Sequence, residues 1–219
     1  MTVRTKDDPP QRSTLADAVY LRLHEDILLG RLRPNSLLIE SDLADQLEVS
    51  RTPVRESLQR LCKDGLIVSR RRRWFVIEPS LIEIRESYDV RAALEGHAAR
   101  LAAARGSQPQ LDAIADALDL REHAGPNTEE YVTSNERFHR LIAEAACTRR
   151  LTEAIEHSKH FYFNVHVARL YRPEDLKNSQ DQHERLFRAI RSRDGETADR
   201  LTRQHISDAF ALIQERWIV

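Results

Sequence analysis

The chain has 219 residues, a formal net charge of −1 and a hydrophobic fraction of 41%, which fits one large domain or two ordinary ones without an overall basic character. Its two cysteines, Cys62 and Cys147, are far apart and exclude a disulfide framework or a thiolate zinc site. The chain contains no signal-peptide core and no apolar run long enough to span a membrane, which predicts a cytoplasmic protein with no membrane partner.

The first predicted element is a polar N-terminal arm followed by a helix. Residues 1–12 contain a Pro-Pro pair and few apolar side chains, which predicts disorder. Thr14 is placed to cap a helix that runs to Gly30, with Asp17 complementing the exposed amides of its first turn. The apolar stripe expected to face the core consists of Ala18, Leu21, Ile27 and Leu28.

Next come two helices joined by a tight turn. Ser41 is expected to cap a short helix that ends at Leu47, residues 48–49 form the turn, and Ser50 caps the second helix. The side chains expected to face the core from the second helix are spaced i, i+4 and i+7, and they are Val54, Leu58 and Leu61.

A second stripe on the same helix is polar. Arg51, Arg55 and Gln59 share one face, from which arginine can reach guanine edges or phosphates. The segments LIVS and WFVI then form a hairpin around residues 70–73, all of them arginine, which would lie near the DNA backbone or minor groove. This order of elements predicts a winged helix-turn-helix, although the arginines could also be ordinary solvated charges.

The stretch LADQLEVSRTPVRESLQRLCKDGLI, and the motif SRTPVRE within it, resembles the GntR family of bacterial transcriptional regulators. Glu48 and Trp74 depart from the resemblance, because the family usually has glycine where Glu48 stands and a glycine near Trp74 at the wing tip. The resemblance implies that one set of residues contacts operator DNA, assisted by the wing: Ser50, Arg51, Thr52 and Arg55, with Arg71, Arg72 and Arg73.

The rest of the chain has a helical period throughout. After residues 79–80, breaks at glycine and proline separate helices expected at 81–105, 108–123, 127–146, 148–169, 173–192 and 195–216. Short connections predict an antiparallel bundle of six or seven helices. We therefore expect a mainly α protein with a disordered arm at 1–12, a DNA-binding domain at 13–79 and a helical domain at 80–219, which would bind an effector and form the dimer.

Three histidines in the expected bundle have spacings that favour convergence. His139 follows Asn135 by four residues, so both share one helix face. His183 and His205 lie eleven residues before and eleven after Asp194, and equal distances from the turn place them at one height in an antiparallel hairpin. Such side chains could build a metal centre, or they could be ordinary core or surface histidines.

Residues 80–219 also resemble the FCD ligand-binding domain of the FadR branch of GntR regulators, in which an aspartate and three histidines often bind a divalent metal beside a small carboxylate. The resemblance carries this role to Asn135, His139, His183 and His205. Asn135 replaces the usual aspartate, and an uncharged amide with three imidazoles suits zinc or nickel.

Further effector contacts are less specific. Arg91 could bind an effector carboxylate in bidentate fashion, or it could form a helix salt bridge with Glu95. Asn164 and Arg169 follow an aromatic cluster and could line the cavity or stabilise the bundle.

The sequence therefore predicts a homodimeric repressor that binds a palindromic operator and responds to a small carboxylate, with a metal in the bundle as one route of binding. Two alternatives remain open. The ion itself could be the effector, or the three histidines could form a metalloenzyme site, although neither Glu136 nor Glu184 is placed as a general base. The expectation is that the protein is not an enzyme.

Overall fold

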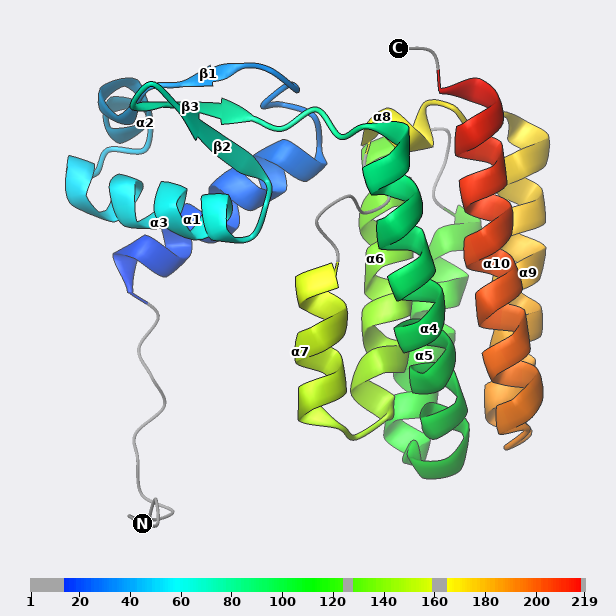
Figure 1. Cartoon of the computed structure of the whole chain (residues 1–219). Helices are drawn as coiled ribbons and strands as arrows, with labels where there is room; N and C mark the ends of the chain where they lie inside the picture. The colour runs from blue at the N-terminus through cyan, green and yellow to red at the C-terminus, as the bar shows by residue number, and fades with distance from the viewer. Residues whose placement is uncertain (1–13, 124–127, 159–164, 218–219) are drawn as a thin grey trace, which may run out of the picture. The chain divides into compact units, whose positions relative to one another are not determined.

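The computed structural model of the protein describes residues 14–123, 128–158 and 165–217 (Figure 1). The arm expected at 1–12 and Asn164 lie outside the described residues. The chain divides into two compact units, one formed by residues 1–27 and 31–78 and the other by residues 28–30 and 79–219. Among the described helices, none has the length and apolar character needed to cross a membrane.

The N-terminal unit is a winged helix-turn-helix, as predicted. Its sheet has the antiparallel order β1-β3-β2, with Leu38 opposite Trp74 and Arg70 opposite Arg73. The short strand β1 was not foreseen by the sequence analysis. The elements of this unit are α1 (Leu15–Leu28), β1 (Leu37–Leu38), α2 (Glu40–Gln46), α3 (Arg51–Lys63), β2 (Ile67–Arg70) and β3 (Arg73–Val76).

Helix α3 buries the face that its spacing predicts. Val54, Leu58 and Leu61 are all completely buried in the core of this unit. Burying each of these side chains contributes roughly 1.5–3 kcal/mol relative to leaving it exposed.

The face expected for α1 was partly wrong, although Ile27 does pack against the core of this unit. Ala18 and Leu21 are exposed, and Leu21 keeps 63% of its surface accessible. The buried side chains are Ala16, Val19 and Leu23, which recur at i, i+3 and i+7. The expected stripe lies partly on the solvent side because each residue turns the helix by about 100°.

Two expected helix caps also differ from the structure. Helix α2 begins at Glu40 with Ile39 as its N-cap, so Ser41 lies inside the helix. Ser50 does occupy the N-cap of α3, but its side chain makes no capping hydrogen bond. Thr14 and Asp17 do cap α1 reciprocally, because each backbone amide donates to the other side chain at 2.8 and 3.2 Å.

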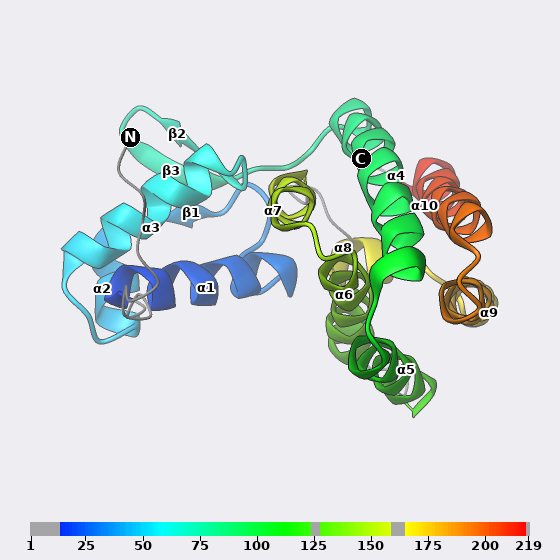
Figure 2. The same cartoon turned by 90° about the horizontal axis from the view of Figure 1, so that it is seen from below.

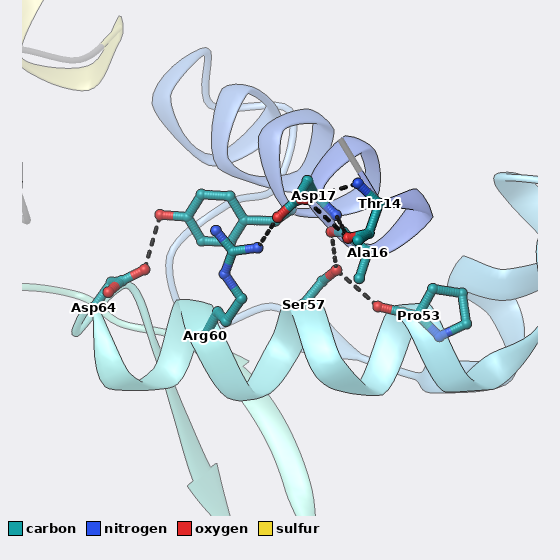
Figure 3. Close-up of polar contacts among 8 residues, drawn as sticks. Thr14, Ala16, Asp17, Pro53, Ser57, Arg60 and Asp64 are labelled. Carbon is teal, nitrogen blue, oxygen red and sulfur yellow. Dashed lines mark hydrogen bonds and ion pairs between the residues drawn. The ribbon is translucent and has the colours of Figure 1, made fainter. Parts of the chain in front are cut away.

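Polar contacts hold α1 against α3, as Figure 3 shows. The buried hydroxyl of Ser57 lies 2.8 Å from the Ala16 carbonyl oxygen and 2.7 Å from that of Pro53. Arg60 on α3 forms an ion pair with Asp17 on α1. Helix α1 therefore covers one side of α3 and leaves the opposite side in solvent.

The C-terminal unit is a helical bundle, seen from the side in Figure 1 and nearly end-on in Figure 2. Where one helix was expected at 148–169, the described residues form two, and residues 159–164 between them are outside the description. The helices are α4 (Leu81–Arg105), α5 (Gln108–His123), α6 (Thr128–Ala145), α7 (Arg149–Ser158), α8 (Val165–Ala168), α9 (Pro173–Arg191) and α10 (Gly195–Arg216).

Helices α4 and α10 lie side by side along the bundle (Figures 1 and 2). Gly96 on α4 leaves room for Asp199 on α10, because a Cβ at position 96 would lie 2.4 Å from Asp199 Oδ1 and that side chain would have to shift. Phe138 on α6 and Ile190 on α9 are completely buried in the largest core cluster of the bundle. The tight packing fixes the relative heights of α4, α6, α9 and α10, which carry the inward-facing polar residues.

Candidate functional site

The exposed face of α3 carries the predicted recognition residues. Arg51, Thr52, Arg55 and Gln59 are all exposed, whereas Val54 is buried. Ser50 is exposed at the start of the helix. This arrangement presents a continuous polar edge that could enter a major groove, with the hydrophobic face held by the unit's core.

The turn before α3 holds a residue other than glycine in a left-handed backbone conformation. Glu48 has φ 54, the left-handed conformation that the usual glycine would adopt without strain. Glutamate is less suited to this conformation than glycine, because its Cβ makes positive φ sterically costly.

The wing is a two-residue hairpin turn with arginine at both central positions. Arg71 and Arg72 have φ 50 and 60, and both are exposed. Positive φ at both positions is the geometry whose twist matches the flanking strands, and it is normally occupied by asparagine or glycine. Arg73 begins β3, is exposed and pairs with Arg70 across the hairpin. The structure thus concentrates four exposed cationic side chains at the wing tip.

An ion pair that was not predicted from the sequence connects α2 with α3. The guanidinium of Arg55 donates to both carboxylate oxygens of Glu40: Nε lies 3.2 Å from Oε1 and 3.0 Å from Oε2, and Nη2 lies 2.7 Å from Oε2. Trp74 Nε1 on β3 lies 3.3 Å from Oε1 of the same carboxylate. The hydrogen bond from Arg55 lowers the pKa of Glu40, so the carboxylate stays charged at neutral pH.

Inside the bundle, three histidines from three helices converge as their spacing predicts. His139 on α6, His183 on α9 and His205 on α10 are all buried. Each offers a ligand atom, and these atoms lie within 4.8 Å of one another. The separation and the imidazole donors are compatible with one metal ion bound between them.

Hydrogen-bond partners of His139 and His205 determine which ring nitrogen of each carries the hydrogen. His205 Nδ1 is 2.8 Å from Oε1 of Gln182, whose amide nitrogen donates to Asp208 at 2.7 Å. His139 Nδ1 lies 3.1 Å from Oε2 of Glu95. Because both partner oxygens only accept, they favour hydrogen on Nδ1 and a lone pair on Nε2. This is the tautomer in which Nε2 can bind a metal.

Asn135 lies one turn before His139 on α6 and is 4% exposed. It lines a small cavity of about 10 Å³ together with Arg91 and His205, roughly the space of one water molecule. The amide thus belongs to the same inner region as the histidines. Arg169 is exposed just after α8 and does not line this cavity, so its effector role stays a prediction.

Arg91 forms the helix salt bridge with Glu95 that was one of its two expected roles. Its Nε donates to Glu95 at 2.9 Å, and both side chains are almost completely buried. Burial alone would raise the pKa of Glu95, but the charge of Arg91 and the contact with His139 hold it well below its usual range. Glu95 therefore joins Arg91 to the histidine cluster, a link that the four-residue spacing did not predict.

The chain matches two known sequence families. The FCD domain family matches residues 86–208, and the family described as bacterial regulatory proteins, gntR family, matches residues 15–77. The matched segments contain the histidine cluster and the exposed face of α3, respectively.

Similar proteins extend over most of the chain. The HTH-type transcriptional repressor RspR of Escherichia coli is 27% identical, covering 95% of this chain and 92% of that protein. The uncharacterised HTH-type regulator YdhC of Bacillus subtilis is 28% identical, covering 85% of this chain and 84% of its own. Among solved structures, E. coli McbR/YncC has the same fold, with a TM-score of 0.84 and 23% identity over 94% of this chain and 99% of that one.

Proposed function

The chain belongs to the GntR family of bacterial regulatory proteins and carries an FCD domain, and from this we propose that it represses transcription from a palindromic operator. The matched families and the relatives are transcriptional regulators, which argues against the metalloenzyme alternative. The repressor assignment is supported by the relative RspR, which is named a repressor. We further propose a homodimer, because two recognition helices about one DNA turn apart give a small DNA-binding domain adequate specificity.

The DNA-reading surface that we propose is the exposed face of α3 together with the wing. One observation supports it above the others: Arg51, Arg55 and Gln59 are exposed along one stripe of the helix, while Val54 and Leu58 are buried on another. Arginine on this face can bind guanine edges in bidentate fashion, and the wing arginines can bind phosphates. Ser50 and Thr52 at the start of the helix complete the set.

Selection of duplexes from a random pool with the full-length protein tests this assignment. The expected product is an inverted repeat with one half-site for each recognition helix, and an enriched site without two-fold symmetry would contradict the dimer. Arg51→Ala and Arg55→Ala should abolish binding to that site while the thermal unfolding midpoint stays unchanged. Normal operator affinity in both variants would show that α3 does not read the DNA.

For the effector we propose a small carboxylate held beside a divalent metal in the bundle. Zinc or nickel suits the donor set, and the ligands would be Asn135, His139, His183 and His205. When bound, the ion would supply the positive charge that attracts a carboxylate. Arg91 lines the adjoining cavity. It could bind the same effector carboxylate if its guanidinium keeps only part of its contact with Glu95 or leaves Glu95 altogether.

The size of the inner cavity favours a second candidate, in which the metal ion alone is the effector. A cavity of about 10 Å³ accommodates a water molecule beside an ion but no organic acid without rearrangement. The two candidates differ in what changes operator affinity. Chelator-treated protein should respond to zinc alone if the ion is the effector, and only to zinc with a carboxylate if the metabolite is.

Elemental analysis of untagged protein tests the metal itself. We expect about one ion per chain, lost in His139→Ala and in His205→Ala, as a single site with imidazole ligands requires. Protein that stays free of metal after supplementation would remove both metal hypotheses and leave Arg91 as the basis for carboxylate binding.

A further inference from the structure

Glu40 is the one acidic residue of the N-terminal unit, among those described, that touches both the recognition helix and the wing. It is the first residue of α2, and its side chain is 22% exposed against 61% for Arg55. Its two oxygens accept hydrogen bonds from Arg55 on α3, and Oε1 also lies near Trp74 Nε1 on β3. One carboxylate thus connects all three elements that form the DNA-facing side.

The contact uses a particular edge of the guanidinium. Arg55 donates through Nε and Nη2, and these two donors form one side of the planar group. A bidentate contact to guanine O6 and N7 needs only two parallel N–H groups from one edge. The edge formed by Nη1 and the second hydrogen of Nη2 is not used by Glu40, and it remains available for a base.

An arginine without a carboxylate partner populates many rotamers and can bind any phosphate within reach. Holding the side chain in one geometry removes that freedom before the DNA arrives, which lowers the entropy lost on specific binding. A carboxylate at the same place also repels nearby phosphates and weakens contacts that carry no sequence information. Both effects increase the difference in affinity between the operator and other DNA.

We propose that Glu40 is a specificity-determining residue that positions Arg55 for a guanine in each operator half-site. Trp74 assists from the wing strand, where its indole N–H approaches the same carboxylate. This gives a role to Trp74, which lies near the position where the family usually has glycine. The inference rests on the proposed role of Arg55 in reading DNA.

Glu40→Gln is the first test, because it keeps the size of the side chain and removes its charge. Affinities of the full-length protein are measured for the selected operator and for an unrelated duplex at one salt concentration. We expect the ratio of the two affinities to fall about ten-fold, and the preference for guanine at one position of each half-site to relax. Preferences at the other positions should stay unchanged.

Glu48→Gln is the matched control. It makes the same chemical change at an exposed glutamate in the turn before α3. Loss of this charge should change the two affinities by similar factors and leave their ratio intact. A ratio that falls equally in both variants would mean that general electrostatics accounts for the effect, and the inference would be wrong.

A coupling measurement separates positioning from a direct contact between Glu40 and DNA. Arg55→Lys keeps the charge but loses the planar edge, so it should also reduce the ratio. Adding Glu40→Gln to Arg55→Lys should then cost little more, since both changes remove the same contact. Independent, multiplying losses would contradict the proposal.

Two further outcomes distinguish failure of the inference from failure of the proposed function. If Arg55→Ala retains normal operator binding, the role of Arg55 itself is wrong. If Arg55→Ala abolishes binding while Glu40→Gln leaves the ratio unchanged, only the role of Glu40 is wrong. Trp74→Phe, which keeps the aromatic packing and removes the N–H donor, should lower the ratio in the same direction by a smaller factor.

Discussion

The Nε2 atoms of His183 and His205 face each other at 3.0 Å across α9 and α10. Gln182 accepts the hydrogen on His205 Nδ1, so the Nε2 of a neutral His205 carries a lone pair. His183 must then donate through its own Nε2, or a cation must lie where the two lone pairs meet. The second arrangement is the one that a bound metal would favour, and it makes the outer residues part of the metal site.

Gln182→Met should therefore weaken metal binding. The variant keeps the length of the side chain and removes the acceptor that holds His205 in the required tautomer. We expect zinc affinity to fall roughly 10-fold or more, the usual cost of losing an outer-shell partner. Competition with a chromophoric chelator measures it.

Gln204 provides a matched control for this measurement. It is exposed on α10 and donates to the other oxygen of Asp208 at 2.7 Å. Gln204→Met should leave zinc affinity unchanged. Equal losses in the two variants would indicate a general effect on Asp208 or on folding rather than control of the His205 tautomer.

Asn135→Asp should tighten metal binding. The substitution restores a charged oxygen ligand at a position that lies one turn from His139 and lines the same cavity as His205. We expect an increase in zinc affinity of about ten-fold, since a carboxylate adds a favourable charge to the ion. Unchanged or weaker binding, measured by the same chelator competition, would show that residue 135 is not a ligand.

The histidine cluster and the α3 faces were predictable because both depend on regular periodicity. The 3.6-residue repeat separated the buried Val54 from the exposed Arg55, and the hairpin around Asp194 placed His183 and His205 at one height. In each case the relevant residues lie on one helix or on two helices joined by a short turn.

The links around these sites were not predictable, because they depend on how separate elements pack. Glu40 and Arg55 are 15 residues apart, and only the crossing of α2 over α3 brings them together. The buried face of α1 was predicted only in part, because the helix has apolar side chains on more than one side, including the exposed Leu21. Periodicity alone does not identify the buried face of such a helix, because tertiary packing determines which apolar side chains are covered.

Arg72→Gly should stabilise the protein and weaken its DNA binding. Arg72 has φ 60, a conformation that glycine adopts without the steric cost that other residues bear. We expect the free energy of unfolding to rise by about 1 kcal/mol. The slope of log affinity against log salt should fall by about one, as expected for the loss of one phosphate contact.

Arg72→Ala separates the two effects, because it removes the same charge while keeping the strained backbone. Its salt dependence should match that of Arg72→Gly, whereas its stability to urea should stay close to that of the parent protein. If Arg72→Ala stabilises the protein as much as Arg72→Gly does, the gain in stability comes from reduced repulsion among the wing arginines. Relief of backbone strain would then not be its cause.

Glu95→Ala should strongly destabilise the bundle. The substitution leaves the buried guanidinium of Arg91 without its carboxylate, and breaking such a pair costs about 3–5 kcal/mol. The control is Glu184→Ala, which breaks the exposed pair with Arg188 on α9 and should cost less than about 0.5 kcal/mol. Urea unfolding with a chelator present compares the two, and similar small losses would contradict the assigned role of Glu95.

The stabilisation from Glu95 should also depend on pH with a definite sign. Burial opposes its ionisation, but Arg91 and His139 hold its pKa in the folded protein below the ordinary value. A group whose pKa is lowered by folding stabilises the protein above its unfolded pKa, about 4.3 for glutamate, and loses that contribution as pH falls below it. The parent protein should therefore exceed Glu95→Gln in unfolding free energy at pH 7, and the difference should begin to shrink below roughly pH 5 and keep shrinking as the pH falls toward the lowered pKa of folded Glu95. Urea titrations of both proteins, with chelator present, measure this difference; a constant gap would mean that the charge of Glu95 does not stabilise the bundle.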